Sequence, residues 1–352
     1  MIGKVGRAIF QSLEVIALAC AFLAAGCSSI SPGPDSIVLS ATQTVHRVWP
    51  PAPAQPRIRF VGNVRSPADL GARLSLWRRA GNFVTGATRG LEPFVRPQAV
   101  SLDERGNLCV ADPGAGAVGY FDRERKKYSR WTASGKEQFV NPVAVAKRGT
   151  TVFVADTAVG KIFCFDEDGK PQLTITNNLR RPAGLAVSSN CLFVADSQAD
   201  KILMFDFSGK LQGQFGGRGI APGMFNAPTH VTLDASGRIY VTDSLNCRLQ
   251  IFDGDGKFLA AAGSMGDSSG HLSRPKGVGV DSFGHVYVVD ALFDNVQAFD
   301  VAGHFLMNWG EAGSDDGEFW LPSGLAVDYA NHIFVADSYN SRIQVFEYVG
   351  SE

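Results

Sequence analysis

The chain has 352 residues, 45% of them hydrophobic and 19% charged, and its formal net charge is -1 at pH 7. Ample apolar material and almost no net charge exclude a disordered chain, and the charge balance gives no sign of a nucleic-acid-binding protein. Because no apolar run reaches about 18 residues, the sequence also excludes a protein with several membrane-spanning helices.

Residues 1–27 have the pattern of a secretory signal. Lys4 and Arg7 form a basic start, residues 15–25 are apolar, and Gly26 and Cys27 follow. The run is too short for a spanning helix. Residues 23–27, Leu-Ala-Ala-Gly-Cys, resemble the lipobox of bacterial lipoproteins. The resemblance implies that Cys27 carries a lipid anchor and that the protein is held in the bacterial cell envelope, at the outer membrane or the periplasmic or extracellular face. A plain secretory signal with an incidental cysteine is the alternative.

Residues 28–56 are predicted to form a tether. The segment is rich in Ser, Pro and Ala, with six prolines between positions 32 and 56. Such a composition buries little apolar surface and favours an extended chain.

Six copies of one unit fill most of the remaining chain. They are marked by six aspartates spaced 44, 40, 47, 47 and 47 residues apart, each with Val two positions before it and Phe nine positions after it. These anchor aspartates are Asp112, Asp156, Asp196, Asp243, Asp290 and Asp337. A proline precedes each one by 14 or 15 positions. A period of this length indicates a repeat architecture in which neighbouring units stack.

Each unit reads as four short strands. Residues 277–281, 286–290 and 295–299 are about five residues each, rich in Val and aromatic residues, and separated by Asp-x-x-Gly turns; residues 258–262 exemplify a fourth strand. Four antiparallel strands at this period predict an all-β, six-bladed β-propeller. The second strands are continuously apolar, which suits strands covered on both faces by neighbouring blades.

The repeats resemble a known family. Val-Ala-Asp-Ser at 335–338, followed by Asn-x-Arg-Ile-Gln-Val-Phe at 340–346, is similar to the NHL repeat. The six copies cover residues 94–347, and blade one departs most from the pattern. The whole chain resembles bacterial six-bladed NHL lipoproteins, which implies a scaffold or assembly role in the envelope.

The sixth unit ends after three strands, at residues 346–348. An unpaired strand edge is a liability, and residues 57–62, Arg-Ile-Arg-Phe-Val-Gly, resemble the fourth strands of the other units. We therefore expect an N-terminal strand to close blade six, within a propeller spanning residues 57–352.

An insert at residues 63–93 is predicted to hold a short amphipathic helix. Ser66 reads as an N-cap before Pro67, with Leu70 and Leu74 on one face and Gly81 as an end. Packing against the propeller and docking of a partner are both open as its role.

Chemistry is expected on the face that collects the loops after the anchor aspartates. The positions after the six prolines mark the predicted channel mouth and are Gln98, Val143, Ala183, Thr229, Lys276 and Ser323, followed in blade four by His230. Six-bladed lactonases hold a cation through carboxylates, and amidating lyases hold zinc through several His. None of these positions is acidic and no three His converge, so we predict no metal, no cofactor and no catalytic residue. His230 is expected to be a partly buried neutral imidazole.

Because the anchor aspartates recur in every blade, we expect them to accept hydrogen bonds from loop amides rather than to act as catalysts. Specificity is then expected where the blades differ. The candidate partner-binding residues are Leu245, Asn246, Leu292, Phe293, Trp320, Tyr339 and Asn340. Apolar side chains on loops suit contact with another envelope or secreted protein, or with a glycan, although folding over the channel is an equal alternative. The sequence thus favours a monomeric, non-catalytic binding or scaffold protein; a metal-dependent hydrolase or lyase is the alternative.

Overall fold

The computed structural model describes residues 47–73 and 91–350. The predicted signal, Cys27 and the tether up to residue 46 lie outside the described residues. Within the described ranges, no helix is both long and apolar enough to cross a membrane.

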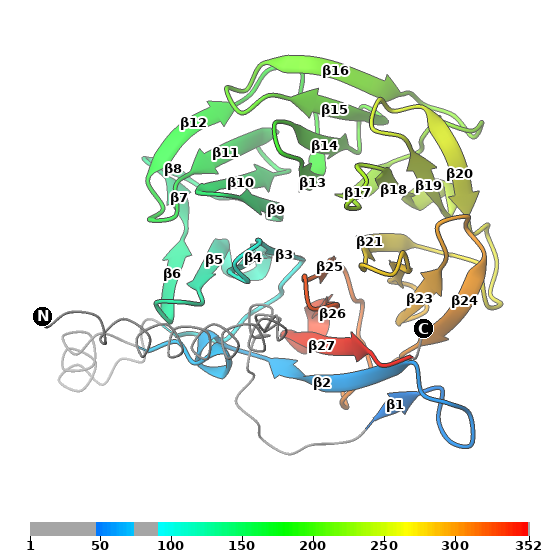
Figure 1. Ribbon diagram of the computed structural model, residues 1–352. Helices are drawn as coiled ribbons and strands as arrows, with labels where there is room; N and C mark the ends of the chain where they lie inside the picture. The colour runs from blue at the N-terminus through cyan, green and yellow to red at the C-terminus, as the bar shows by residue number, and fades with distance from the viewer. Residues whose placement is uncertain (1–46, 74–90, 351–352) are drawn as a thin grey trace, which may run out of the picture. The chain divides into compact units, whose positions relative to one another are not determined.

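Six antiparallel sheets surround a central channel as the blades of a propeller (Figure 1), as predicted. Each of blades one to five has four strands in sequential order. Blade one comprises β3 (Ala99–Leu102), β4 (Leu108–Asp112), β5 (Ala117–Asp122) and β6 (Lys127–Trp131). Blade two comprises β9 (Pro142–Arg148), β10 (Thr151–Asp156), β11 (Lys161–Phe165) and β12 (Pro171–Ile175). Blade three comprises β13 (Pro182–Val187), β14 (Leu192–Asp196), β15 (Lys201–Phe205) and β16 (Leu211–Gly216).

The remaining blades follow the same plan. Blade four comprises β17 (Pro228–Leu233), β18 (Ile239–Asp243), β19 (Arg248–Phe252) and β20 (Phe258–Ala262). Blade five comprises β21 (Pro275–Val280), β22 (Val286–Asp290), β23 (Asn295–Phe299) and β24 (Phe305–Trp309). Blade six contains β25 (Leu325–Val327), β26 (His332–Asp337) and β27 (Arg342–Tyr348). A small hairpin, β7 (Ala133–Ser134) and β8 (Glu137–Gln138), links blades one and two.

Burial follows position within the blade. The second strands β4, β14, β18 and β22 are buried at every residue, because neighbouring blades cover both of their faces. The outer strands β20 and β24 alternate between exposed and more buried residues, since one face meets solvent. The core therefore lies between blades rather than in one central cluster.

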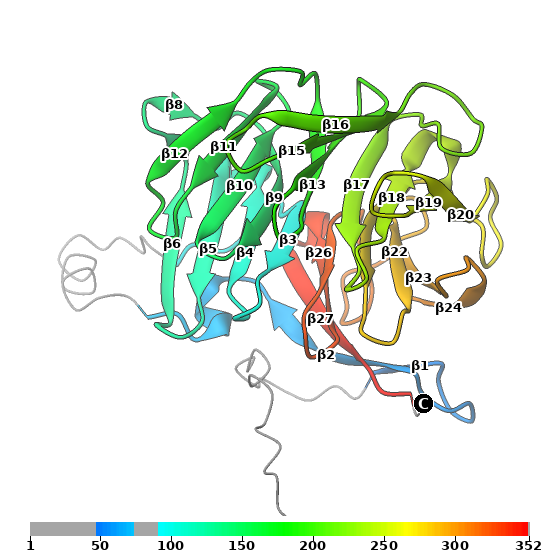
Figure 2. The same ribbon diagram turned by 45° about the horizontal axis from the view of Figure 1, so that its top comes forward.

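The N-terminal strand β2 (Ile58–Val64) closes the ring. It pairs antiparallel with β27, with Ile58 opposite Tyr348 and Val64 opposite Ile343, and the two strands lie side by side in Figures 1 and 2. Phe60 packs edge-on against Phe346, their ring centroids 5.7 Å apart. The predicted closure of blade six is confirmed.

The end of the predicted tether differs from expectation. Residues 47–56 are not a free extended chain, because β1 (Val48–Trp49) pairs with β2 as a fifth strand of blade six. Arg47 donates to the carbonyl of Asp316 at 2.5 Å and pairs with Glu311 at 2.9 Å. These contacts offset the conformational entropy that is lost when this Pro-rich segment becomes ordered.

The insert also differs from the predicted helix over its described part. A single 3-10 turn, η1 (Pro67–Leu70), forms where the helix was expected to start. It ends because Gly71 takes a left-handed conformation, with φ of 76°. Residues 74–90, which include the rest of the predicted amphipathic face, lie outside the described residues.

Candidate functional site

The six anchor aspartates end the second strands and hold the loops of one face, here called the loop face. Each carboxylate accepts a hydrogen bond from the backbone amide two residues before the proline of its blade. These amides are those of Val95, Val140, Arg180, Asn226, Ser273 and Trp320, at 2.7, 2.7, 2.6, 2.7, 2.6 and 2.8 Å. All six aspartates are buried. Their predicted role as structural acceptors of loop amides is confirmed.

Two anchors also carry a buried or partly buried arginine partner. Arg248 Nε lies 2.9 Å from Asp243, and Arg342 Nε lies 2.7 Å from Asp337. The lysine at the same position in blade two, Lys161, instead pairs with a glutamate outside the anchor set at 2.5 Å. The loops of blades four and six are therefore the most heavily braced.

Four of the predicted partner-binding side chains stand exposed on the loop face. Leu245, Leu292, Trp320 and Tyr339 are 59%, 57%, 54% and 48% exposed. The rings of Trp320 and Tyr339 lie 5.7 Å apart, so they form one continuous apolar surface.

The other three predicted residues are engaged within the protein. Phe293 is half-buried. The side-chain amides of Asn246 and Asn340 donate to the carbonyls of Gly219 and Gly313 at 2.9 and 2.8 Å, and each also donates to the anchor aspartate of its own blade. They support the loops that carry Leu245 and Tyr339.

Two exposed valines on the loop face were not predicted. Val95 and Val140 are 53% and 60% exposed. They stand two residues before the proline of their blades, the position that Trp320 holds in blade six. Alignment of the six copies at their prolines places Val95 and Val140 at the position of Trp320, so the sequence could have identified them as exposed.

The loops that carry these side chains have fixed backbones. Leu245 and Tyr339 lie in the single-turn 3-10 helices η3 (Ser244–Asn246) and η4 (Ser338–Asn340). Their amides donate to the carbonyls of Asn226 and Trp320 at 3.1 and 3.2 Å. Each loop is thus joined to the segment that links it to the preceding blade.

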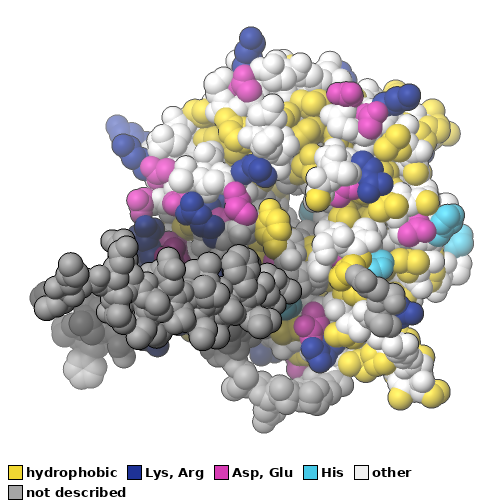
Figure 3. Space-filling model, in the orientation of Figure 1, with side chains coloured by type: hydrophobic (Ala, Val, Ile, Leu, Met, Phe, Trp, Pro, Cys, Tyr) yellow, Lys and Arg dark blue, Asp and Glu magenta, His cyan; other side chains and the backbone are white. Residues whose placement is uncertain are grey.

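The central channel encloses a cavity of about 650 Å³. Its walls are the first strands of the blades, β3, β9, β13, β17, β21 and β25, together with the turns that follow them. These turns form the face opposite the loop face, here called the turn face, which is hollowed near its centre in Figure 3. The cavity therefore opens on the turn face, whereas the sequence predicts a site on the loop face.

Of the three predicted channel residues, only His230 lines this cavity. Gln98 and Lys276 lie nearer the loop face, directly after the prolines of blades one and five. The second position after each proline is Gly or Ala in every blade except blade four, where it is His230. At this level β13 and β17 are very close, because a Cβ added to Gly184 would lie 2.5 Å from the carbonyl oxygen of Thr229.

His230 is partly exposed as a residue, but both of its ring nitrogens are buried. Neither has a hydrogen-bond partner in the part of the chain that the structure describes. Burial, and then the charge of Lys276, lower the pKa of His230 to about 3. The imidazole is therefore neutral at physiological pH, as predicted, and its polar atoms are unused.

Lys276 is a half-buried cation that lies nearer the loop face. Burial lowers its pKa, and the nearby Arg274 lowers it further. Within the described ranges, no carboxylate lies within 4.0 Å of its ammonium group. Lys276 is thus a cation without a countercharge.

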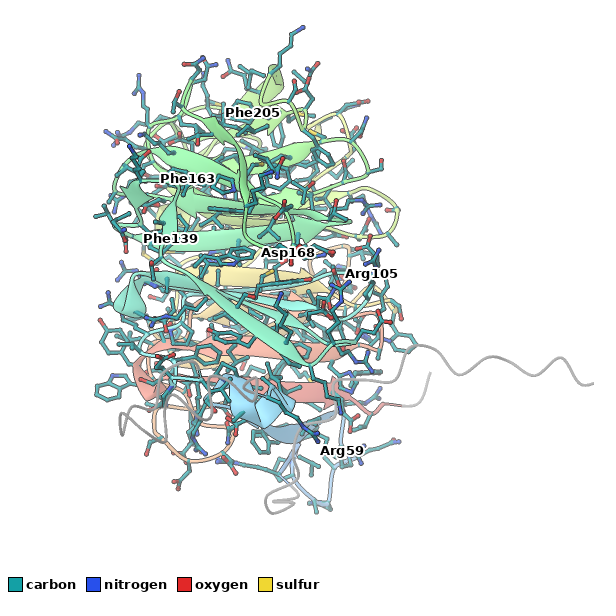
Figure 4. The ribbon with its side chains drawn as sticks, turned by 90° about the vertical axis from the view of Figure 1, so that its left-hand side faces the viewer. Arg59, Arg105, Phe139, Phe163, Asp168 and Phe205 are labelled. Carbon is teal, nitrogen blue, oxygen red and sulfur yellow. The ribbon has the colours of Figure 1, made fainter. Side chains whose placement is uncertain are left out.

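A different lysine, Lys147, shows how a buried ammonium is usually accommodated here. Its Nζ contacts Asp103 and lies 3.0 Å from Glu167, which in turn lies 3.8 Å from Arg105. This network joins blades one and two at the turn face, where Figure 4 shows Arg105, with Phe139 toward the opposite face. The charges compensate one another, which is the arrangement that burial requires.

Three histidines lie on the turn face, as expected. His285, His304 and His332 each bond through Nδ1 to the aspartate four residues earlier, at 2.8, 2.9 and 3.0 Å. Among the described residues, no three His, Cys, Asp or Glu side chains form a group that could hold a metal ion.

The model of the NHL repeat matches residues 225–252 and 319–346, in blades four and six. The chain contains NHL repeats. This six-bladed NHL propeller has no match in the comparison with curated protein sequences.

The NHL propeller is similar to several solved structures. A streptogramin B lyase has a TM-score of 0.55 and 12% identity, covering 73% of this chain and 95% of that chain. A catalytically inactive virginiamycin B lyase from Staphylococcus aureus with quinupristin has a TM-score of 0.53 and 12% identity, with coverage of 72% and 95%. A protein of unknown function from Bacteroides thetaiotaomicron has a TM-score of 0.56 and 14% identity, with coverage of 73% and 70%. At these identities the similarity shows the fold alone.

Proposed function

We propose that this propeller is a binding protein that holds another protein of the bacterial envelope against its loop face. The observation that carries the proposal is the group of exposed apolar side chains on the loops of blades four to six, Leu245, Leu292, Trp320 and Tyr339. Trp and Tyr are the residue types that contribute most at protein interfaces. A connected apolar surface that is exposed to solvent, such as that of Trp320 and Tyr339, is typical of a contact site.

The bracing of the loops supports the proposal. The amide of Trp320 is held by Asp337, and that of Tyr339 by the carbonyl of Trp320. Side chains presented on a fixed backbone lose little conformational entropy when a partner binds, so more of the contact energy appears as affinity.

Crosslinking in cells followed by affinity purification tests this function. The loop-face variant replaces Leu292, Trp320 and Tyr339 with Ala. A matched turn-face variant replaces Phe283 and Tyr329, which are 48% and 71% exposed, with Ala as well. We expect the loop-face variant to lose its crosslinked protein and the turn-face variant to keep it. Retention of the same protein by the loop-face variant would falsify the proposal, and specific capture of a glycan alone would replace it.

Anchoring at the envelope is part of the proposal. Cys27 follows a run that resembles a lipobox, and a lipid on this cysteine would tether a monomeric propeller to the membrane. Metabolic labelling with a fatty acid should label the chain, and Cys27→Ser should abolish the label. A labelled Cys27→Ser chain would refute acylation at this site.

One observation favours a second candidate, an envelope hydrolase or lyase. The cavity of about 650 Å³ has an unpartnered imidazole, His230, at its inner end, and cavities with convergent polar groups are common sites of chemistry. The sequence places no acidic residue at the predicted channel mouth. Calcium or zinc that stays bound in stoichiometric amount through dialysis would favour this enzyme over the binding protein.

A further inference from the structure

Four cationic residues lie on the loop face, at or just before the start of the first strands of blades one, three and five. Arg96, Arg181 and Arg274 directly precede the prolines of blades one, three and five, and Lys276 directly follows the proline of blade five. The same pre-proline position in blades two, four and six holds the uncharged Asn141, Ala227 and Leu321. The arginines therefore stand in alternate blades, spread around the channel axis.

None of these four side chains pairs with a carboxylate in the described ranges. The carboxylates nearest this face are already occupied. The anchor aspartates accept loop amides, and Asp200 and Asp294 accept the amides of Ala227 and Leu321 at 2.7 and 2.6 Å. The positive charge at this end of the channel is left without an internal countercharge.

We call the part of the channel at Lys276 on β21 and His230 on β17, the loop-face end of the cavity, the throat. Strands β17 and β21, which carry them, pack side by side, and the charge of Lys276 acts directly on His230. Lys276 can only donate hydrogen bonds, and the neutral His230 has one N–H donor to offer. The hydroxyl of Thr229, the residue between Pro228 and His230, is taken up by Ser244 at 2.6 Å.

Buried donors and charges that lack a partner are rare, because each one costs free energy unless an acceptor is present. Lys147 meets this requirement with two carboxylates of its own chain. Among the described residues, the buried N–H of His230 has no acceptor and the half-buried Lys276 has no carboxylate partner. An acceptor suited to both would carry negative charge and at least two lone pairs.

We propose that the throat is an oxyanion-binding site, in which Lys276 and His230 hold a carboxylate or phosphate group that enters between the arginines of the loop face. An oxyanion offers several acceptor atoms to donors from different directions, and its charge suits both ammonium and guanidinium groups. This site is separate from the apolar surface of Trp320 and Tyr339 and does not depend on the partner proposed above.

The test is isothermal titration of the folded chain with sodium phosphate and with sodium acetate, each against a chloride solution of equal ionic strength. We expect saturable binding of at least one oxyanion to the wild-type protein. Lys276→Met should weaken that binding at least tenfold, the ratio expected for loss of one charge-assisted hydrogen bond. Lys201→Met removes a lysine at the start of β15, the third strand of blade three, and should leave oxyanion binding unchanged.

Two further variants separate a binding role from a folding role. Lys276→Met should melt at or above the temperature of the wild-type protein in chloride, because it removes a half-buried ammonium that pairs with no carboxylate of the described residues. His230→Gln keeps a donor and should retain most of the affinity, whereas His230→Leu should lose about tenfold. No saturable binding of either oxyanion, or unchanged binding by folded Lys276→Met, would overturn the proposal.

Discussion

The backbone amide of Trp320 donates a hydrogen bond of 2.8 Å to Oδ1 of Asp337. The other carboxylate oxygen of Asp337 accepts from Asn340, Arg342 and Gln344 at 2.9, 2.7 and 3.0 Å. One buried aspartate therefore fixes both the loop that follows it and the segment that presents the exposed indole.

The first prediction concerns this aspartate. Asp337→Ala removes the nearer carboxylate of Arg342, which is 1% exposed, and leaves Asp316 at 3.8 Å as its remaining counterion. Loss of one partner of a buried pair costs about 3–5 kcal/mol, so urea unfolding should show a decrease of this size in the free energy of unfolding. Asp267→Ala, at an exposed loop position, is the control and should change stability by less than about 0.5 kcal/mol.

The second prediction tests ring closure. Phe60 is 7% exposed and packs on Phe346, whereas its neighbour Val61 points outward and is 39% exposed. Phe60→Ala should lower the free energy of unfolding by about 3–5 kcal/mol because it leaves a cavity between β2 and β27. Val61→Ala should have little effect. Equal melting temperatures for the two variants would show that the strand does not stabilise the ring.

The third prediction is a pH dependence at the turn face. The hydrogen bond to Asp328 raises the pKa of His332 above its ordinary value of 6.5, and Glu347 Oε2 lies 3.9 Å from its other ring nitrogen. The stabilisation is complete below the unfolded pKa and is lost as pH rises through the folded pKa. His332→Gln should therefore cost more stability near pH 5 than near pH 8.5, measured by urea unfolding.

The control for this effect is His304, which makes the same bond to Asp300 but has a side chain 78% exposed. Solvent screens such a pair. His304→Gln should therefore differ little from the wild-type protein at either pH. A pH-independent effect of His332→Gln would contradict the assignment.

The fourth prediction concerns the buried imidazole in the channel. The folded pKa of His230, about 3, lies below the ordinary value of 6.5, so the unfolded chain binds a proton first as the pH falls. Stability is therefore lost as pH falls from 6.5 toward 3, by about 2–3 kcal/mol at pH 4.5. His230→Leu should lack this component. Parallel stability curves for the two proteins in chloride salts would refute the buried, neutral state.

Much of the fold could be predicted from the sequence because the repeated residues perform repeated structural tasks. The anchor aspartates recur because every blade needs an acceptor for the same loop amide. Leu245 and Tyr339 could be identified as exposed because they differ from the Gly and Ala at the same position in blades one and two. Comparison among the copies separated structural residues from variable ones.

The features that were missed depend on contacts between distant parts of the chain. Val48 and Trp49 pair with β2, and the indole of Trp49 lies over Gly317, where an added Cβ would be 2.4 Å from the ring. Nothing in a two-residue segment among prolines signals that contact. The cavity on the turn face has the same origin, since its walls come from six strands far apart in the sequence.

The pairing of β2 with β27 has a consequence for biosynthesis. Strand β2 leaves the ribosome before every strand of blades one to five, whereas its partner at residues 342–348 follows all of them. Blades one to five can form as each hairpin emerges. Ile58 and Phe60 stay unpaired until β27 has been made, because β27 is the strand with which β2 pairs. Closure of the ring therefore follows synthesis of β27. A chain stalled before Arg342 would expose the unpaired edges of β2 and β26, which quality-control factors can recognise.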